Sequence, residues 1–192
     1  WGAHTYLCGD TILKHGSEEQ KRKYLPQLAS GEWVGAFGLT EPGAGSDAAS
    51  IRTTATRKGD IYLLNGTKMF ITNGPIADVL VVIAITDKEK KGAGISAFIL
   101  DKNFPGYSVG RELRKMGVKA STTGELIFED CPVPAENILR REGDGFLIAL
   151  GTVEWDRSTL MAPFLGGLEY ALEASVRYAK ERVQFGRPIA SF

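Results

Sequence analysis

The stretch "KYLPQLASGEWVGAFGLTEPGAGSD", Lys23 to Asp47, contains the change of periodicity that decides the fold. Before Gly31, apolar residues recur at helical spacing, and Ser17 supplies a cap for the predicted helix. Gly31 predicts its end. From Glu32 the apolar residues alternate, which predicts a β-strand that runs into a glycine-rich loop.

One face of that strand becomes steadily smaller, through Val34, Ala36, Gly38 and Thr40. Small side chains let a flat ligand approach the backbone, but they equally let another strand pack there. The loop "LTEPGAGSD" has the same ambiguity. Uncovered backbone N–H groups beside Thr40 and Ser46 suit phosphate oxygens or a flat polar ring. A Gly/Pro-rich connection is the alternative.

Downstream, short alternating segments follow one another without a convincing helix between them, which favours an antiparallel β-barrel or sandwich. Asn65-Gly66 between two such runs predicts a hairpin turn. The predicted strands are "SIRTTATRKG", the two halves of "IYLLNGTKMFITNG", "VLVVIAIT", "GISAFILD", "YSVGREL", "TTGELIFEDCPVP" and a short "ENIL".

After Gly143 the apolar residues return to helical spacing for about forty residues, and Pro163 and Gly166-Gly167 are places where the helix is expected to bend. The predicted fold class is therefore α+β, with a β-barrel or sandwich flanked by helical segments. Trp1 falls inside an expected helix, and no polar tail follows "FGRPIASF". We expect the chain to be an excerpt of a longer protein, and the isolated piece to be incomplete as an enzyme.

Composition excludes several classes of function. With 23 basic and 23 acidic residues the net charge is zero, and no basic stripe predicts nucleic-acid binding. The longest apolar run, Val79 to Ile85, is too short to span a bilayer. Cys8 and Cys131 lack metal-site spacing and favour a reduced, intracellular protein, and His4 and His15 lack clustered partners. We predict no metal site.

The stretch "KMFITNG", Lys68 to Gly74, is the second informative segment. In a strand, Phe70 and Thr72 share one face, so an aromatic plane lies next to a hydroxyl and forms a wall for a planar heteroaromatic ring. The alternative is an ordinary strand, because aromatic residues and threonine are common in strands.

Four stretches, in this order and spacing, resemble the acyl-CoA dehydrogenase family of flavoproteins across essentially the whole chain: "KYLPQLASGEWVGAFGLTEPGAGSD", "NGTKMFITNG", "FEDCPVPAENIL" and "ERVQFGRPI". The resemblance implies three parts. Residues 1–31 are the end of an N-terminal helical domain, 32–140 a middle β-domain that binds flavin and thioester, and 141–192 the start of a C-terminal helical domain.

The resemblance also implies that FAD is the cofactor. Thr40 is expected to contact the pyrimidine side of the flavin and Ser46 the diphosphate, while Phe70 stacks on the ring at a position often held by tryptophan. Thr72 is expected to donate its hydroxyl to flavin N5. The remaining residues expected to contact FAD are Phe37, Leu39, Gly45 and Ile71, with Arg182, Gln184 and Phe185 reaching the FAD of a neighbouring subunit.

For the substrate, the resemblance assigns contacts with the CoA part to Ser46, Thr86 and Glu154, and places Arg157 near the catalytic base. The base itself has three interpretations. Asp156 occupies the position that a branched-chain and long-chain subset uses, although aspartate is one methylene shorter than the expected glutamate. Alternatively, the base lies beyond residue 192, or Asp156 binds a polar substrate or pairs with Arg157.

The resemblance implies that the function is FAD-dependent α,β-desaturation of an acyl-CoA, with electrons passed to an electron-transfer flavoprotein by a homotetramer. The alternatives are an oxidase, a monooxygenase or a carrier-protein-linked relative of the same fold, or a non-catalytic FAD-binding relative. The intact "TEPGAGSD" argues against a monooxygenase. The expected location is the cytoplasm in a bacterium and the mitochondrial matrix in a eukaryote.

Overall fold

The computed structural model describes residues 1–192, which form two compact units, Trp1–Glu154 and Trp155–Phe192. A π-helical turn, Ala3–Gly9, leads into α1 (Asp10–His15) and α2 (Glu18–Ser30). The strands of the first unit are β1 (Gly35–Gly38), β2 (Thr54–Lys58), β3 (Ile61–Thr72), β4 (Val79–Ile85), β5 (Ile95–Asp101), β6 (Tyr107–Glu112) and β7 (Thr123–Pro134). They are followed by α3 (Gly145–Thr159), α4 (Ala162–Glu181) and the short strands β8 (Val183–Gln184) and β9 (Arg187–Pro188).

Helix α2 begins and ends as its local sequence predicts. The Ser17 hydroxyl accepts a hydrogen bond from the Gln20 N–H at 3.2 Å, and the Ser17 N–H donates to the Gln20 side chain at 2.8 Å. This reciprocal pair is a capping box. Gly31 ends the helix in the left-handed conformation, with φ of 77°.

The seven strands of the first unit form one mixed sheet in the order β1-β4-β2-β3-β7-β6, with β5 on the other side of β4. The α+β class is confirmed, but the sheet is not wholly antiparallel. Strand β1 pairs with β4 in parallel, Gly35 opposite Val79, and Thr54 of β2 pairs in parallel with Ile85 of β4. Because β1 and β2 share one edge of β4, the chain between them, Leu39–Thr53, leaves that edge as a long loop.

Two local predictions are wrong. Asn65-Gly66 does not form a hairpin turn but lies inside the 12-residue strand β3, at a register irregularity against β7. The chain turns instead between Lys58 and Ile61. The predicted strand "ENIL" is mainly a 3₁₀ turn, Ala135–Asn137.

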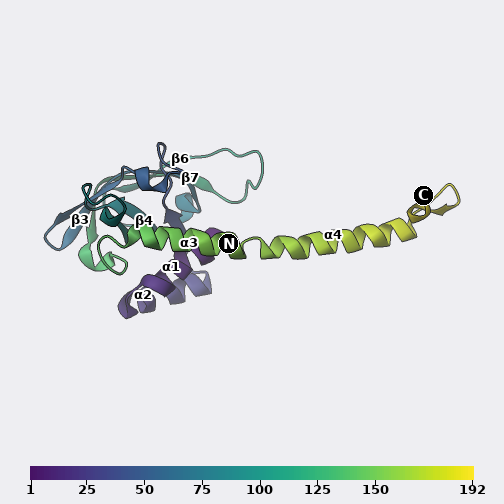
Figure 1. The fold of residues 1–192 in the computed structure, drawn as a ribbon, viewed down its shortest axis with the longest axis horizontal. Coiled ribbons are helices and arrows are strands. Elements are labelled where there is room, and N and C mark those ends of the chain that lie inside the picture. The colour runs from purple at the N-terminus through teal and green to yellow at the C-terminus, as the bar shows by residue number, and fades with distance from the viewer. The chain divides into compact units, whose positions relative to one another are not determined.

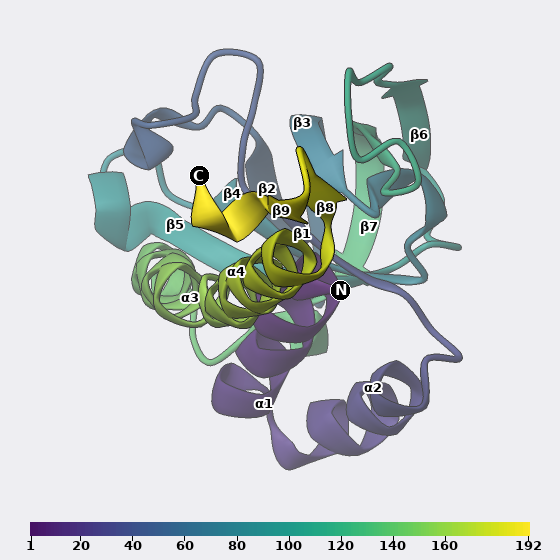
Figure 2. The same cartoon turned by 90° about the vertical axis from the view of Figure 1, so that its right-hand side faces the viewer.

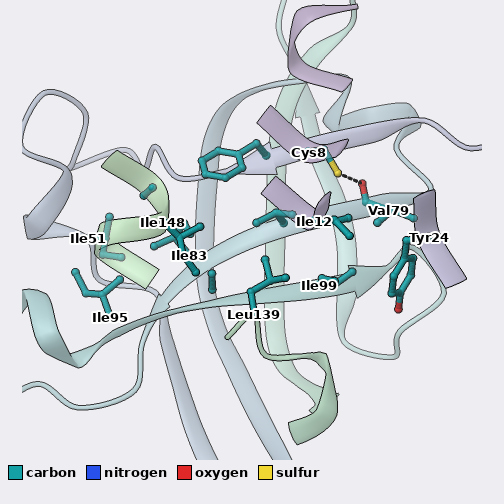
Figure 3. Close-up of a cluster of buried hydrophobic side chains, with 14 of the residues drawn as sticks. Cys8, Ile12, Tyr24, Ile51, Val79, Ile83, Ile95, Ile99, Leu139 and Ile148 are labelled. Atoms are coloured by element: carbon teal, nitrogen blue, oxygen red, sulfur yellow. Dashed lines mark hydrogen bonds between the residues drawn. The ribbon is translucent and has the colours of Figure 1, made fainter. Parts of the chain in front are cut away.

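Strand β4 is buried on both faces, which explains its unbroken apolar sequence. Its odd-numbered residues pack with β5, with the N-terminal helices and with Ile148 of α3, as Figure 3 shows around Ile12, Ile83 and Ile99. Its even-numbered residues, including Leu80 and Val82, pack against β2, β3 and β7. Helices α1 and α2 therefore cover one side of the sheet (Figures 1 and 2).

The second unit, Trp155–Phe192, contains α4 and the β8–β9 hairpin. Helix α4 exposes many apolar side chains, and the β8–β9 hairpin that follows exposes 93% of Phe185. No helix of the chain combines the length and apolar composition needed to span a bilayer.

Candidate functional site

The structure brings the two informative stretches of the sequence together. The Met69 N–H of β3 donates to the Thr40 carbonyl at 2.8 Å, and the Lys68 ammonium donates to the Leu39 carbonyl at 3.0 Å. The start of the glycine loop is thus attached to the strand that carries Phe70 and Thr72.

Phe70 is held in an unusual conformation. The register of β3 against β7 shifts between Lys68 and Ile71, and Phe70 has φ of +60°, a region that L-residues with large side chains rarely adopt. The residue is 59% exposed, whereas the next one, Ile71, is buried in the core. An aromatic ring held outward on a strained backbone is a feature of binding sites. Thr72, two residues on, is half-buried.

The glycine loop is tight at its start and open beyond it. Glu41 and Ala44 exchange two backbone hydrogen bonds, at 2.9 and 3.1 Å. A Cβ added at Gly43 or Gly45 would meet no atom within 4 Å, and neither has a positive φ. Packing within the chain therefore does not require glycine at these two positions, and the space beside them is open. Ser46 is exposed at the end of this segment.

The small side chains on one face of β1 are explained by packing within the protein and not by a flat ligand. A Cβ at Gly38 would lie 3.4 Å from Lys68 Cγ and 3.5 Å from a Val82 methyl group. Ala36 on the same face is fully buried. The small residues there make room for the neighbouring strands and the Lys68 stem. Phe37 is also buried, at 8% exposure, so only its backbone is available to line a cofactor.

Lys68 and Glu41 form a buried ion pair that the sequence analysis did not single out. Their charged atoms are 2.8 Å apart, with side-chain exposures of 0% and 5%. Burial lowers the pKa of Lys68 to about 8, against the opposing effect of Glu41. Burial raises the pKa of Glu41, but the charge of Lys68 and backbone N–H donors outweigh it, so that pKa lies below its ordinary value. Both residues stand in the two quoted motifs, which is the only sequence signal for them.

A pocket of about 340 Å³ lies where the glycine loop meets the β4–β5 turn. Ser46 directly precedes Asp47, which lines this pocket, and Thr86 stands between two more lining residues, Ile85 and Asp87. The two predicted CoA contacts in this part of the chain are therefore next in sequence to lining residues, but neither lines the pocket itself. Its complete lining is Asp47, Ala49, Ser50, Ile85, Asp87, Lys88, Lys91 and Ile95.

The Thr86 hydroxyl already takes part in a chain of hydrogen bonds. The Gly143 N–H donates to Ser96 Oγ at 2.9 Å, Ser96 and Thr86 hydroxyls lie 2.8 Å apart, and Thr86 donates to the Gly94 carbonyl at 3.2 Å. Either hydroxyl of the Ser96–Thr86 pair can be the donor, and the Gly94 carbonyl also accepts the backbone N–H groups of Thr86 and Asp87, at 2.8 and 3.0 Å. The Thr86 hydroxyl can therefore donate to a ligand or accept from one.

The remaining predicted residues lie on α3 and beyond. Asp156 is in the last turn of α3; burial raises the pKa of its carboxyl group, and the positive charge of Arg157 opposes that shift. Glu154 lies two residues earlier on the same helix, at the end of the first unit. Arg182, Gln184 and Phe185 lie at the end of α4 and in the β8–β9 hairpin.

Three features of β3 and the glycine loop fit a planar, phosphate-bearing cofactor: an outward aromatic ring, a half-buried hydroxyl and open glycine backbone. A metal centre has no comparable support, since no group of three or more His, Cys, Asp or Glu side chains is arranged to hold one.

Comparison with known proteins identifies the class. Family models for the N-terminal, middle and C-terminal domains of acyl-CoA dehydrogenase match residues 1–32, 36–131 and 143–192. The chain belongs to the acyl-CoA dehydrogenase family.

Individual relatives are similar over the whole chain. An acyl-CoA dehydrogenase of Bacillus subtilis is 54% identical over 98% of this chain and 50% of its own length. The butyryl-CoA dehydrogenase structure from Megasphaera elsdenii is 49% identical with a TM-score of 0.92, over 100% of this chain and 50% of that one. A chain from the structural work on the electron transferring flavoprotein of Acidaminococcus fermentans is 55% identical with a TM-score of 0.92, again over 100% and 50%. The chain spans about half the length of the curated relatives it matches.

Proposed function

We propose that the protein containing this chain is an FAD-dependent dehydrogenase that introduces an α,β double bond into an acyl-CoA. The observation that carries the proposal is the exposed Phe70 ring on a strained bulge, attached through Met69 to Thr40 of the glycine loop. FAD, when bound, supplies the acceptor for the hydride that leaves the β-carbon.

In this proposal the residues of the first unit hold the cofactor. Phe70 stacks on the flavin, Thr72 donates its hydroxyl to flavin N5, and Thr40 binds the pyrimidine side. Gly45 and Ser46 offer backbone and hydroxyl donors to the diphosphate. Phe37, Leu39 and Ile71 contribute backbone groups, because the side chains of Phe37 and Ile71 are buried.

The proposed substrate contacts are Ser46, Thr86, Glu154 and Arg157. The Thr86 hydroxyl lies within hydrogen-bond distance of Ser96 Oγ and the Gly94 carbonyl, and its oxygen can accept a further hydrogen bond. We propose that Thr86 accepts a hydrogen bond from an amide N–H of the CoA arm.

Asp156 is the candidate base within this chain. A base must remove the α-proton, and the raised pKa of Asp156 makes its carboxylate more basic than an ordinary aspartate. The competing position is a carboxylate in the remainder of the protein, beyond residue 192.

The proposed assembly is a homotetramer that passes electrons to an electron-transfer flavoprotein, with Arg182, Gln184 and Phe185 reaching the FAD of a neighbouring copy. Phe185 is 93% exposed, which supports that role. We propose the same three-part organisation, with boundaries after residues 31 and 140.

The test uses the full-length protein with FAD, titrated under anaerobic conditions with straight- and branched-chain acyl-CoAs while flavin absorbance is followed. We expect one of these thioesters to bleach the flavin, which would name the acyl class. Bound flavin that no thioester bleaches contradicts the proposal.

Asp156→Asn then tests the base. If Asp156 is the base, the variant binds FAD and thioester normally but is not bleached. Bleaching at the wild-type rate would place the base elsewhere. Glu154→Gln, on the same helix, is the matched control and is expected to change thioester affinity with less effect on the bleaching rate at saturation.

A further inference from the structure

The glycine loop is closed by one carboxylate. Glu41 accepts hydrogen bonds from the backbone N–H groups of Arg52, at 2.6 Å, and Thr53, at 3.0 Å. Glu41 stands near the start of the Leu39–Thr53 loop, which contains the glycine loop, and Arg52 and Thr53 stand at the end of Leu39–Thr53. The carboxylate of Glu41 therefore joins the two ends of the Leu39–Thr53 loop.

Lys68 attaches that closed loop to β3. Its ammonium group contacts Glu41 Oε1 at 2.8 Å and the Leu39 carbonyl at 3.0 Å. Met69 adds the backbone hydrogen bond to the Thr40 carbonyl, and the next residue, Phe70, is exposed. Two consecutive residues of β3, Lys68 and Met69, thus bind the loop, and the residue that follows them carries the exposed ring.

Stability alone does not account for a charged pair in this place. Removing two charges from water costs free energy, and apolar side chains of similar volume often stabilise a fold equally well or better. What an apolar pair lacks is direction: it offers no donor to the Leu39 carbonyl and no acceptor for Arg52 and Thr53.

We propose that Lys68 and Glu41 are positioning residues that hold the Leu39–Thr53 loop at the distance from Phe70 and Thr72 that FAD binding requires. The inference rests on the proposed function, because it assigns the loop to that cofactor. Neither side chain needs to touch the cofactor, since both are buried, with exposures of 0% and 5%.

The test compares single and double variants of the full-length protein. Lys68→Met leaves the Glu41 charge buried without its partner and is expected to destabilise the fold. The double variant Lys68→Met/Glu41→Gln removes both charges, while glutamine keeps an oxygen for Arg52 or Thr53. We expect the double variant to regain most of the lost stability but to bind FAD at least about tenfold more weakly than wild type, which corresponds to about 1.4 kcal/mol.

A second, more exposed pair in the same unit, Lys102 and Asp78 with side-chain exposures of 53% and 19%, is the control. Asp78 also combines a lysine, Lys102 at 2.6 Å, with a backbone donor, Val34 N–H at 2.8 Å, and both partners lie outside the loop. Lys102→Met and Lys102→Met/Asp78→Asn are expected to change melting temperature without changing FAD affinity.

Hydrogen exchange of the apoprotein supplies a readout that does not depend on FAD. In the double Lys68/Glu41 variant the amides of Leu39–Thr53 should exchange faster, while those of β4 remain protected. In the double Lys102/Asp78 variant the loop should be unchanged.

The outcomes separate this inference from the proposed function. Wild-type FAD affinity and unchanged loop exchange in the double Lys68/Glu41 variant would overturn the positioning role and leave the proposed function intact. A wild-type protein that binds no FAD would overturn the proposed function and the assignment of the loop to that cofactor together. If FAD affinity falls in proportion to melting temperature in the variants of both pairs, Lys68 and Glu41 have only a structural role.

Discussion

Replacing Phe70 with glycine should separate cofactor binding from folding. The exchange relieves the positive φ of 60°, which costs an L-residue about 1–2 kcal/mol. Two terms oppose this gain. Because 59% of the residue is exposed, deleting the ring loses about 1 kcal/mol of burial, where full burial contributes about 1.5–3 kcal/mol. Glycine also costs about 0.5–1 kcal/mol through the entropy of the unfolded chain.

These terms nearly cancel, so the free energy of unfolding of the apoprotein should stay within about 1 kcal/mol of wild type. FAD affinity should fall about 5- to 150-fold, since stacking of a ring on an aromatic side chain contributes about 1–3 kcal/mol. Urea unfolding of the full-length apoprotein measures the first quantity and titration with FAD the second.

Phe70→Trp is the conservative control and should keep FAD affinity, because an indole also stacks. Phe98→Ala is the opposite control: Phe98 is fully buried, so its loss should cost about 3–5 kcal/mol of stability. Wild-type FAD affinity in Phe70→Gly would refute the stacking role of the ring. An apoprotein that loses more than about 3 kcal/mol of stability would show that the ring is part of the core.

The remaining predictions concern how stability depends on pH through Glu41 and how Gly66 and Gly45 respond to substitution by alanine. Because the pKa of Glu41 is below its ordinary value of 4.5 in the folded state, the stability from its ionised form is present above that pH and lost as pH falls below it. Urea unfolding across acidic pH should therefore show a shallower decline for Glu41→Gln, and an unchanged slope would contradict the pairing. Gly66→Ala should destabilise the fold by about 1–3 kcal/mol, because its Cβ would lie 2.5 Å from Thr53 Oγ1 at a φ of 146°; a neutral effect in thermal unfolding would refute this. Gly45→Ala, with no atom within 4 Å of the added carbon, should leave thermal stability unchanged and weaken FAD binding; equal FAD affinity would remove the loop from the site.

Much of the site was predictable because it lies in contiguous motifs. Thr40 and Ser46 stand in one stretch and Phe70 and Thr72 in another, and the structure joins the two through Met69 and Thr40. The buried pair of Lys68 and Glu41 was not predictable from residue type, because a lysine in an alternating strand is normally expected to face solvent.

The hairpin turn predicted at Asn65-Gly66 was wrong for a similar reason. Asn65-Gly66 carries the local signature of a tight turn. In the folded protein Asn65 instead pairs with Asp130 of β7, at 2.8 and 3.0 Å, and Gly66 admits the close approach of Thr53. A two-residue signature contains no information about strands that arrive from elsewhere in the chain.

The sequence by itself determined the features that depend on neighbouring residues: the capped helix from Glu18 to Ser30, the doubly buried strand from Val79 to Ile85, and the family to which the chain belongs. Only the tertiary structure decided that Lys68 is buried, that β1 and β2 lie parallel to β4, and that Phe70 turns outward with a positive φ. The physical reason is the distance along the chain over which each interaction acts. Caps and apolar periodicity act over a few residues, whereas an ion pair between residues 41 and 68 and the register of β3 against β7 are set by contacts between distant segments that form only when the sheet is assembled.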